Sequence, residues 1–210
     1  MIFSPVAVVI LSGIIQGDVL QLLNGNCFFR TQNMKETDEP ILRIGKWDMI
    51  IAFPPCTYLS NAGACRLYPK KGQFNIERYK KGLEARAFFM KFYTANCDKI
   101  AIENPVSSHI FNMPKHTQEI QPYQFGHPVT KKTRLWLKNL PSLQPTNIVE
   151  PEAPYIPAGT SRKDPTKYGQ AIRKGKDAVQ RSKTFPGIAK TMAEQWAGAN
   201  TSAAYDEKVM

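Results

Sequence analysis

Apolar residues recur along the chain with two different periods, and these periods predict strands and helices. Four short and mostly apolar runs are typical of buried strands. They lie at residues 6–11, 47–53, 99–102 and 133–137. Two longer segments, residues 76–93 and 186–196, place apolar side chains three or four residues apart, which predicts amphipathic helices.

The order of these elements predicts the fold class. A strand, a helix and a strand follow one another through the middle of the chain, which favours an α/β fold with a mostly parallel sheet. Sheets of this kind bind ligands beyond the carboxyl ends of their strands. Two loops, residues 54–56 and residues 103–105, follow predicted strands directly. We therefore expect a functional site where these two loops meet.

The length of 210 residues allows one sizeable core, so we expect one domain with extensions. Residues 1–145 carry the core, and residues 184–198 form a closing helix that packs on it. Residues 146–183 are rich in proline, glycine and charge, which indicates a short variable segment. Residues 199–210 form a polar tail.

The charge balance points to an anionic partner. Lysine and arginine number 28 against 17 acidic residues, a formal net charge of +11 that favours polyanions such as nucleic acid. The four cysteines form no C-x-x-C pair and have no metal-ligand spacing with histidine, so we expect no metal. The first apolar run is short and interrupted, so we expect no membrane span and no signal peptide. These features predict a soluble, cytoplasmic monomer.

Three residues are candidates for chemistry at the strand ends. Cys56 follows two prolines, so a rigid turn would present its thiol to a cleft; the alternative is a cysteine that only fills space. Glu103 could act as an acid with a raised pKa, or cap a turn. Arg134 could bind a phosphate or steady a substrate carbonyl, or lie on a solvated strand edge.

Four separated strings are more specific than any single residue. In order, they are WDMIIAFPPCTYLSNAG, KIAIENPVSSHIF, QPYQFGHPVTKKTRLWLKNLP and RSKTFPGIAKTMAEQW. Together, over residues 15–198, they closely resemble DNA cytosine methyltransferases of the C5 class from phages and bacteria. The resemblance implies a Rossmann-like fold, S-adenosylmethionine as cofactor, DNA as partner, and a bacterial or phage-infected cell as location.

Two family motifs fall on the loops at the predicted strand ends. The Pro-Cys motif falls on Pro55 and Cys56, which assigns Cys56 as the nucleophile. The Glu-Asn-Val motif falls on Glu103 and Asn104, with Pro105 in place of valine. The resemblance therefore implies that Glu103 is the acid at the N3 edge of cytosine and that Asn104 binds the substrate.

A third motif supplies cations near the substrate. The family's Gln-x-Arg-x-Arg pattern falls on Thr130, Lys132 and Arg134, so only its last arginine is retained. The resemblance implies that Arg134 orients the base and that Lys132 contributes to substrate binding. It also implies that the variable segment, residues 146–183, contacts DNA.

The implied mechanism is covalent catalysis. A Cys56 thiolate adds to C6 of cytosine while Glu103 protonates or hydrogen-bonds N3, so that C5 becomes able to take a methyl group from S-adenosylmethionine. Loss of the C5 proton then expels Cys56. Because the reacting face is stacked inside duplex DNA, the base has to be flipped out.

The amino-terminal part departs from the family pattern. Members have a strand, a glycine-rich loop, a helix and a second strand that ends in an acidic residue, and much of this is missing here. Gly13 corresponds to a remnant of the loop, and Asp18 lies in a stretch that resembles the later contact with adenine. We assign Gly13, Asp18 and Pro55 to the cofactor site and expect a fold without its first strand–helix unit, with impaired cofactor binding.

Two other functions stay open. The defective amino-terminal part motivates a non-catalytic relic that binds DNA without turnover, which cofactor binding would distinguish from the enzyme. Pro54 and Pro55 also resemble the Pro-Pro loop of amino methyltransferases that act on DNA. That second function is disfavoured because Cys56 stands where those enzymes have an aromatic residue.

Overall fold

The computed structural model describes residues 47–152 and 184–197, together with Leu20, Leu23 and the backbone of four short strands. These strands are β1 (Val8–Ile10), β2 (Gly13–Ile15), β3 (Cys27–Phe29) and β4 (Leu42–Ile44). They form two separate antiparallel pairs, β1 with β2 and β3 with β4. Residues 153–183, most of the predicted variable segment, lie outside the described residues.

A strand is confirmed within residues 6–11, but the expectation that it pairs with a parallel neighbour is wrong. The strand that the structure describes there, Val8–Ile10, pairs antiparallel with β2 so that Ile10 lies opposite Gly13. The physical reason is the connection between them, residues 11–12. Two residues can join antiparallel strands in a hairpin, whereas parallel neighbours need a crossover of a dozen residues or more.

The central sheet has four strands in the order β5-β6-β8-β7. They are β5 (Met49–Ala52), β6 (Lys99–Pro105), β7 (Gln118–Ile120) and β8 (Thr133–Lys138). β5 and β6 are parallel, whereas β8 is antiparallel to both β6 and β7. The strands predicted at residues 47–53, 99–102 and 133–137 are thus confirmed. The first observed strand is shorter than its predicted range, and the other two are longer.

The prediction of a mostly parallel sheet is wrong for the described strands. β5 and β6 are parallel because α3 (Ile76–Tyr93) crosses over between them. β7 and β8 are joined by residues 121–132, whose one helical turn is η3 (Pro122–Gln124). No crossover helix lies there, so β8 returns antiparallel beside β6. The chain is mixed α/β.

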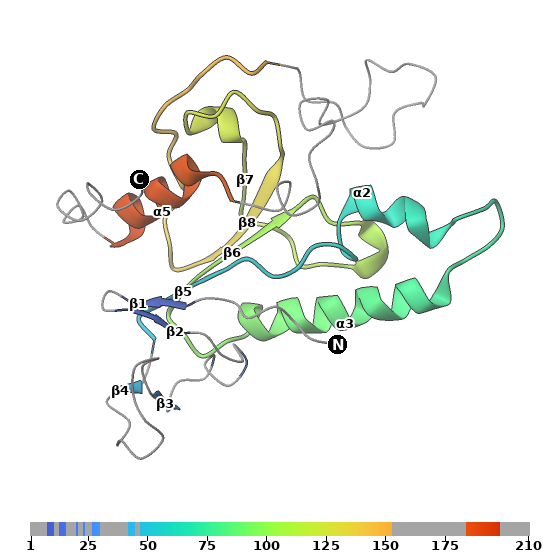
Figure 1. Cartoon of the computed structure of the whole chain (residues 1–210), viewed down its shortest axis with the longest axis horizontal. Helices are drawn as coiled ribbons and strands as arrows, with labels where there is room; N and C mark the ends of the chain where they lie inside the picture. The colour runs from blue at the N-terminus through green and yellow to red at the C-terminus, as the bar shows by residue number, and fades with distance from the viewer. Residues whose placement is uncertain are drawn as a thin grey trace.

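Two helices cover opposite faces of this sheet, α3 on one and α5 (Pro186–Ala197) on the other (Figure 1). Alternate residues of β6 supply the two cores: Ile100 and Ile102 pack with Phe89 of α3, and Ala101 packs with Met192 of α5. Both helices confirm the sequence prediction.

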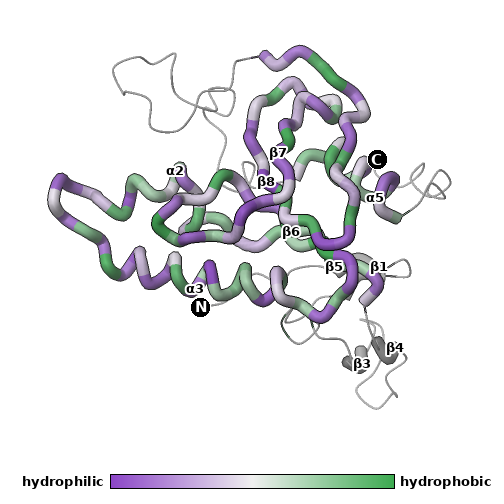
Figure 2. The backbone as a smooth tube through the Cα atoms, turned by 180° about the vertical axis from the view of Figure 1, so that it is seen from behind, coloured by the Kyte–Doolittle hydropathy of each residue, from purple (hydrophilic) through white to green (hydrophobic). Residues whose placement is uncertain are grey.

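Local sequence explains the bounds of α3. The Asn75 side chain accepts a hydrogen bond from the Arg78 backbone N–H at 2.9 Å and so caps the first turn. Hydrophilic and hydrophobic residues alternate along the helix (Figure 2). Gly82 is buried, and a Cβ there would overlap the Phe111 ring, so the helix approaches η2 (His109–Phe111) closely.

Two short elements follow β5 and lead towards α3. They are α2 (Asn61–Ala64) and η1 (Cys65–Leu67). The Ser60 side chain caps α2 by accepting a hydrogen bond from the Gly63 N–H at 3.2 Å. Within the part of the chain that the structure describes, no helix is both long and apolar enough to cross a membrane.

Candidate functional site

Cys56 lies on a tight turn immediately after β5. Its carbonyl oxygen accepts hydrogen bonds from the backbone N–H groups of Leu59, at 3.1 Å, and Ser60, at 2.9 Å. Leu59 is fully buried in the core on the α3 side and anchors the turn. Pro54 is buried and Pro55 is exposed. The turn therefore holds the half-buried Cys56 in place at the carboxyl end of the strand.

Glu103 lies within β6 rather than after it. The sequence predicts that this strand ends at residue 102, but pairing continues through Pro105. The extension follows from β8, which supplies Leu135 opposite Glu103 and Arg134 opposite Asn104. Glu103 is consequently held by a strand with a fixed backbone.

The segments after β5 and β6 are tied together at this edge of the sheet. Asn104, with a side chain only 1% exposed, donates from Nδ2 to the Pro54 carbonyl oxygen at 2.9 Å. The Asn61 N–H donates to the Val106 carbonyl at 2.8 Å, and the Ser108 N–H to that of Leu59 at 2.8 Å. The predicted meeting of the two loops at one end of the sheet is confirmed.

Electrostatic interactions connect Cys56, Glu103 and Lys131, which we call the Cys56 cluster. Burial raises the pKa of the Cys56 thiol, the charge of Glu103 raises it further, and Lys131 lowers it. Burial also raises the pKa of the Glu103 carboxyl, and Lys131 again acts in the opposite direction. Because such interactions weaken with distance, we treat the three groups as one candidate site.

The Cys56 cluster combines a nucleophile, an acid and a cation. A carboxyl group with a raised pKa keeps its proton to higher pH and can donate it. The Lys131 ammonium favours both the thiolate and the carboxylate, and so opposes the cost of either charge. This arrangement can add a thiolate to an electron-poor ring while a neighbouring ring nitrogen is protonated.

Lys131 is the member of the cluster that the sequence analysis does not single out. Its backbone N–H donates to Oε1 of Gln121 at 2.9 Å, and its ammonium lies 5.8 Å from the centre of the Phe185 ring, next to α5. The sequence signal that could have identified Lys131 is the alternation of side chains between the two faces of an extended chain, continued back from β8. Lys131 shares its parity with Leu135, which lies opposite Glu103, whereas Arg134 does not.

Lys132 and Arg134 engage another partner. Lys132 Nζ lies 2.9 Å from Glu119, and Arg134 Nε donates to the same carboxylate at 3.0 Å. Burial alone would raise the pKa of Glu119, but the hydrogen bonds from Lys132 and Arg134 outweigh it, so the pKa is lowered. The strand register places Arg134 on the face that carries Asn104 and Glu119, opposite to the face of Glu103. The structure therefore does not bring these two cations to Cys56.

The residues predicted to hold the cofactor are described only in part. Gly13 begins β2, and Asp18 lies outside the described residues. Pro55 is exposed beside Cys56 at the end of β5. β5 is the edge of the described sheet, and β1 and β2 pair with each other instead of extending it. The described residues alone thus do not form a site that fits S-adenosylmethionine.

No group of three or more His, Cys, Asp or Glu side chains in the described ranges could hold a metal ion. Comparison of the chain with models of known protein families, with curated proteins and with solved structures finds no match.

Proposed function

We propose that the chain acts on cytosine in DNA by covalent addition of Cys56 to C6, as part of cytosine C5 methylation. The observation that carries this proposal is the Cys56 cluster. A thiol on a fixed turn, a carboxyl group with a raised pKa and one cation meet at the carboxyl ends of two parallel strands. The resemblance to C5 methyltransferases assigns catalytic roles to the same two groups, the Cys56 thiol and the Glu103 carboxyl group.

The roles of the two acidic groups follow from their pKa values. Glu103, whose carboxyl pKa is raised by burial, donates its proton to N3 of the ring and so withdraws electrons from C6. The Cys56 thiolate then forms the S–C6 bond, and the electron pair moves to C5. Lys131 stabilises the thiolate before addition and the Glu103 carboxylate after it.

S-adenosylmethionine, as the resemblance implies, would supply the methyl group that C5 takes up. Asn104 contributes by position, because its buried Nδ2 group donates to the Pro54 carbonyl. It thereby holds the Pro-Pro-Cys turn against β6. The net charge of +11 favours the approach of DNA.

The proposal is tested by trapping. The protein is mixed with S-adenosylmethionine and duplex DNA in which 5-fluorocytosine replaces cytosine, and the products are separated under denaturing conditions. Expulsion of Cys56 requires the loss of a proton from C5. Because C5 carries fluorine in place of that hydrogen, this elimination cannot occur and the adduct through Cys56 persists. We expect a covalent protein–DNA band that is absent for Cys56→Ala and present for Cys65→Ala, a matched change at an exposed cysteine.

The other two functions predict different outcomes. An amino methyltransferase would transfer methyl groups without an adduct, and Cys56→Ala would retain that transfer. A non-catalytic relic would bind DNA, and calorimetry would find no heat of binding for S-adenosylmethionine. Either result would reject the proposed reaction for this chain.

A further inference from the structure

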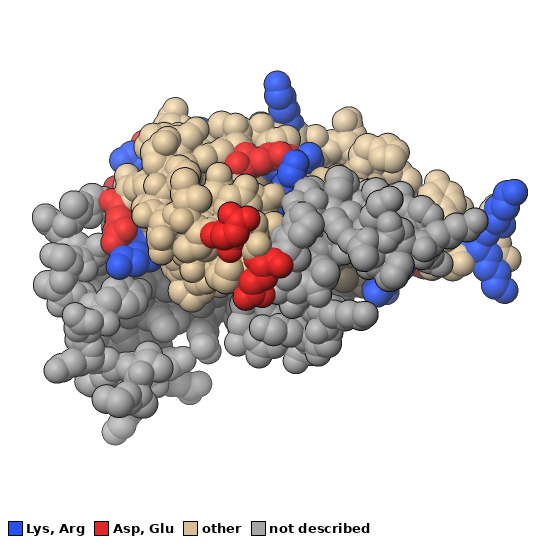
Figure 3. All heavy atoms as spheres, turned by 90° about the horizontal axis from the view of Figure 1, so that it is seen from above, with Lys and Arg blue, Asp and Glu red and all other residues tan. Residues whose placement is uncertain are grey.

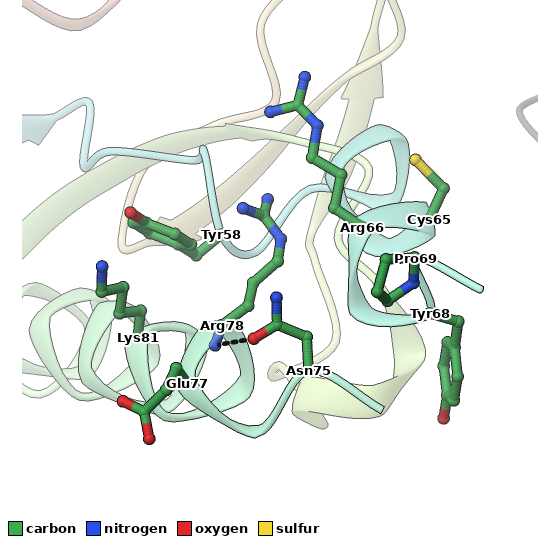
Figure 4. A pocket seen from close by; sticks show the side chains of 9 residues that line it. All are labelled: Tyr58, Cys65, Arg66, Tyr68, Pro69, Asn75, Glu77, Arg78 and Lys81. Carbon is green, nitrogen blue, oxygen red and sulfur yellow. Dashed lines mark hydrogen bonds between the residues drawn. The ribbon is translucent and has the colours of Figure 1, made fainter. Parts of the chain in front are cut away.

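A groove of about 700 Å³ lies beside the turn that carries Cys56, on the side away from α5. Its walls are the turn after β5, η1 and the first turns of α3 (Figure 4). Tyr58, two residues after Cys56, forms one wall, and Tyr68 lies at the other end. The volume is in the range of sites for small organic ligands.

Cations line this groove. Arg66, Arg78 and Lys81 contribute side chains, against one carboxylate, Glu77, which lies 3.1 Å from the Lys80 ammonium. The positive charge continues to the turn between η1 and α3, where blue side chains gather at one end of the molecule without red ones on the face that Figure 3 shows. The groove is therefore complementary to an anion.

Arg78 connects the groove to the turn that carries Cys56. Its Nη2 donates to the Thr57 carbonyl at 3.0 Å, and its guanidinium lies 5.0 Å from the centre of the Tyr58 ring. Nε of the same side chain is buried and has no hydrogen-bond partner within the described part of the chain. A Cβ at Gly63 would lie 3.1 Å from Nη2 and 2.7 Å from the Thr57 oxygen, so the glycine leaves room for this contact.

Aromatic side chains at the open end are exposed. Tyr68 is 57% exposed and Phe74 is 42% exposed, and their ring centres lie 5.3 Å apart. The ring beside a guanidinium group is that of Tyr58, whereas Tyr68 offers an exposed ring at the other end of the groove. Exposed aromatic rings and cations that line one groove are typical of surfaces that bind single nucleic-acid strands, because the bases stack on the rings and the phosphates contact the cations. An acidic peptide would use the cations but would leave these rings unexplained.

We propose that this groove binds a single nucleic-acid strand, with its phosphates on Arg66, Arg78 and Lys81 and a base on Tyr68. The inference deepens the proposed function and rests on it, since the bound strand would be the one that presents cytosine to Cys56. A strand held here would also contact the residues that follow the nucleophile, Thr57 and Tyr58.

The test measures the binding of a short, fluorescent, cytosine-containing single strand by anisotropy at several salt concentrations. The groove variant is Arg66→Ala with Lys81→Ala, which leaves Arg78 and its contact with Thr57 in place. The matched control is Lys91→Ala with Lys99→Ala, which removes two exposed lysines outside the groove. A third variant, Tyr68→Ala, removes the stacking surface without changing the charge.

We expect the groove variant to weaken binding roughly tenfold and to lower the slope of log K against log salt by about 1.4, since each contact with a single strand contributes about 0.7. Tyr68→Ala should weaken binding several-fold with little change of slope. Equal losses in the groove variant and the lysine control would overturn the inference. Displacement of the strand by inorganic phosphate at matched ionic strength would also overturn it, since the groove would then be a site for small anions.

The trapping experiment separates this inference from the proposed function. If the parent protein forms the Cys56 adduct and the groove variant forms it equally well at limiting DNA, the groove inference fails alone. If no adduct forms but the groove variant still loses strand binding selectively, the proposed reaction fails and the strand site stands.

Discussion

At the scale of single residues, the proposed reaction needs Cys56 and Glu103 in opposite protonation states. The thiol has to lose its proton, whereas the carboxyl group has to keep one, and burial favours the neutral form of both. Lys131 is the group that lowers both pKa values. Cys56 reactivity should therefore respond in opposite directions to neutralisation of its two neighbours.

Alkylation of Cys56 by iodoacetamide tests this relation. Lys131→Gln should raise the pKa of Cys56 further and slow alkylation several-fold at neutral pH, because the thiolate is the reactive form. Glu103→Gln should speed alkylation, since it removes the negative charge that raises the same pKa. Rates are read at Cys56 by peptide mass spectrometry, with the exposed Cys65 as internal reference. Equal rates for Lys131→Gln and Lys131→Arg would show that the lysine charge does not act on Cys56.

Glu103 should also weaken the fold as pH rises. In strongly acidic solution the carboxyl group is protonated in both states and has no effect. As pH rises through the ordinary carboxyl pKa, the unfolded chain releases its proton first, so the free energy of unfolding falls until pH passes the raised folded pKa. We expect Glu103→Gln to be more stable than the parent at neutral pH and to lack this fall.

Urea unfolding over a range of pH measures this effect. Glu84→Gln on the exposed side of α3 is the matched control, and it should leave the pH dependence unchanged. A Glu103→Gln protein less stable than the parent at neutral pH would contradict the burial argument.

The sequence predicts Cys56 and Glu103 because each follows an apolar run, and buried strands are recognisable from such runs. Lys131 is different, since its place depends on the pairing of β8 with β6. Register between strands far apart in the chain is set by tertiary packing, and a single sequence does not specify it. The same register places Arg134 with Glu119 instead of with Cys56.

At the scale of elements, the site depends on the hydrogen bond that joins β6 to the Pro-Pro-Cys turn after β5. Asn104→Ala would leave the buried Pro54 carbonyl without its donor, so we expect a loss of about 1–3 kcal/mol in the free energy of unfolding. Adduct formation should fall with it, because the Pro-Pro-Cys turn is released from β6. Asn96→Ala, an exposed change of the same kind, should alter neither urea unfolding nor trapping. If Asn104→Ala matched the parent protein in both urea unfolding and adduct formation, Asn104 would have no positioning role.

The contact of α3 with η2 makes a second prediction at this scale. Alanine has the higher intrinsic helix propensity, yet Gly82→Ala should destabilise the protein by about 1–3 kcal/mol, because the added methyl group overlaps the Phe111 ring. Urea unfolding measures the change, with Leu83→Ala as an exposed neighbour that should cost little. Stabilisation by Gly82→Ala would mean that α3 does not approach η2 so closely.

The periodicity predicts both helices and three of the central strands, since it reports which face of an element is buried. It does not report strand direction. The antiparallel return of β8 follows from the connection at residues 121–132, which contains no crossover helix. The mixture of helices and strands is thus accessible from the sequence, whereas the direction of this strand is not.

At the scale of the whole molecule, net charge predicts the class of partner but not the cations that meet it. Lys132 and Arg134 belong to the Glu119 ion pairs on β7 and β8. The groove beside the Cys56 turn instead combines arginine and lysine with exposed aromatic rings. The proposed strand site begins at Tyr58, two residues after the proposed nucleophile.

The most direct test of the central claim uses no cofactor. Addition of Cys56 to C6 makes C5 basic enough to take a deuteron from heavy water. Loss of the original C5 proton to solvent and expulsion of the Cys56 thiolate then release cytosine with deuterium at C5. We expect deuterium at C5 in DNA incubated with the parent protein, only background deuterium with Cys56→Ala, and strongly reduced deuterium with Glu103→Gln. Exchange that persists in Cys56→Ala, or its absence in a parent protein that binds the DNA, would contradict the account.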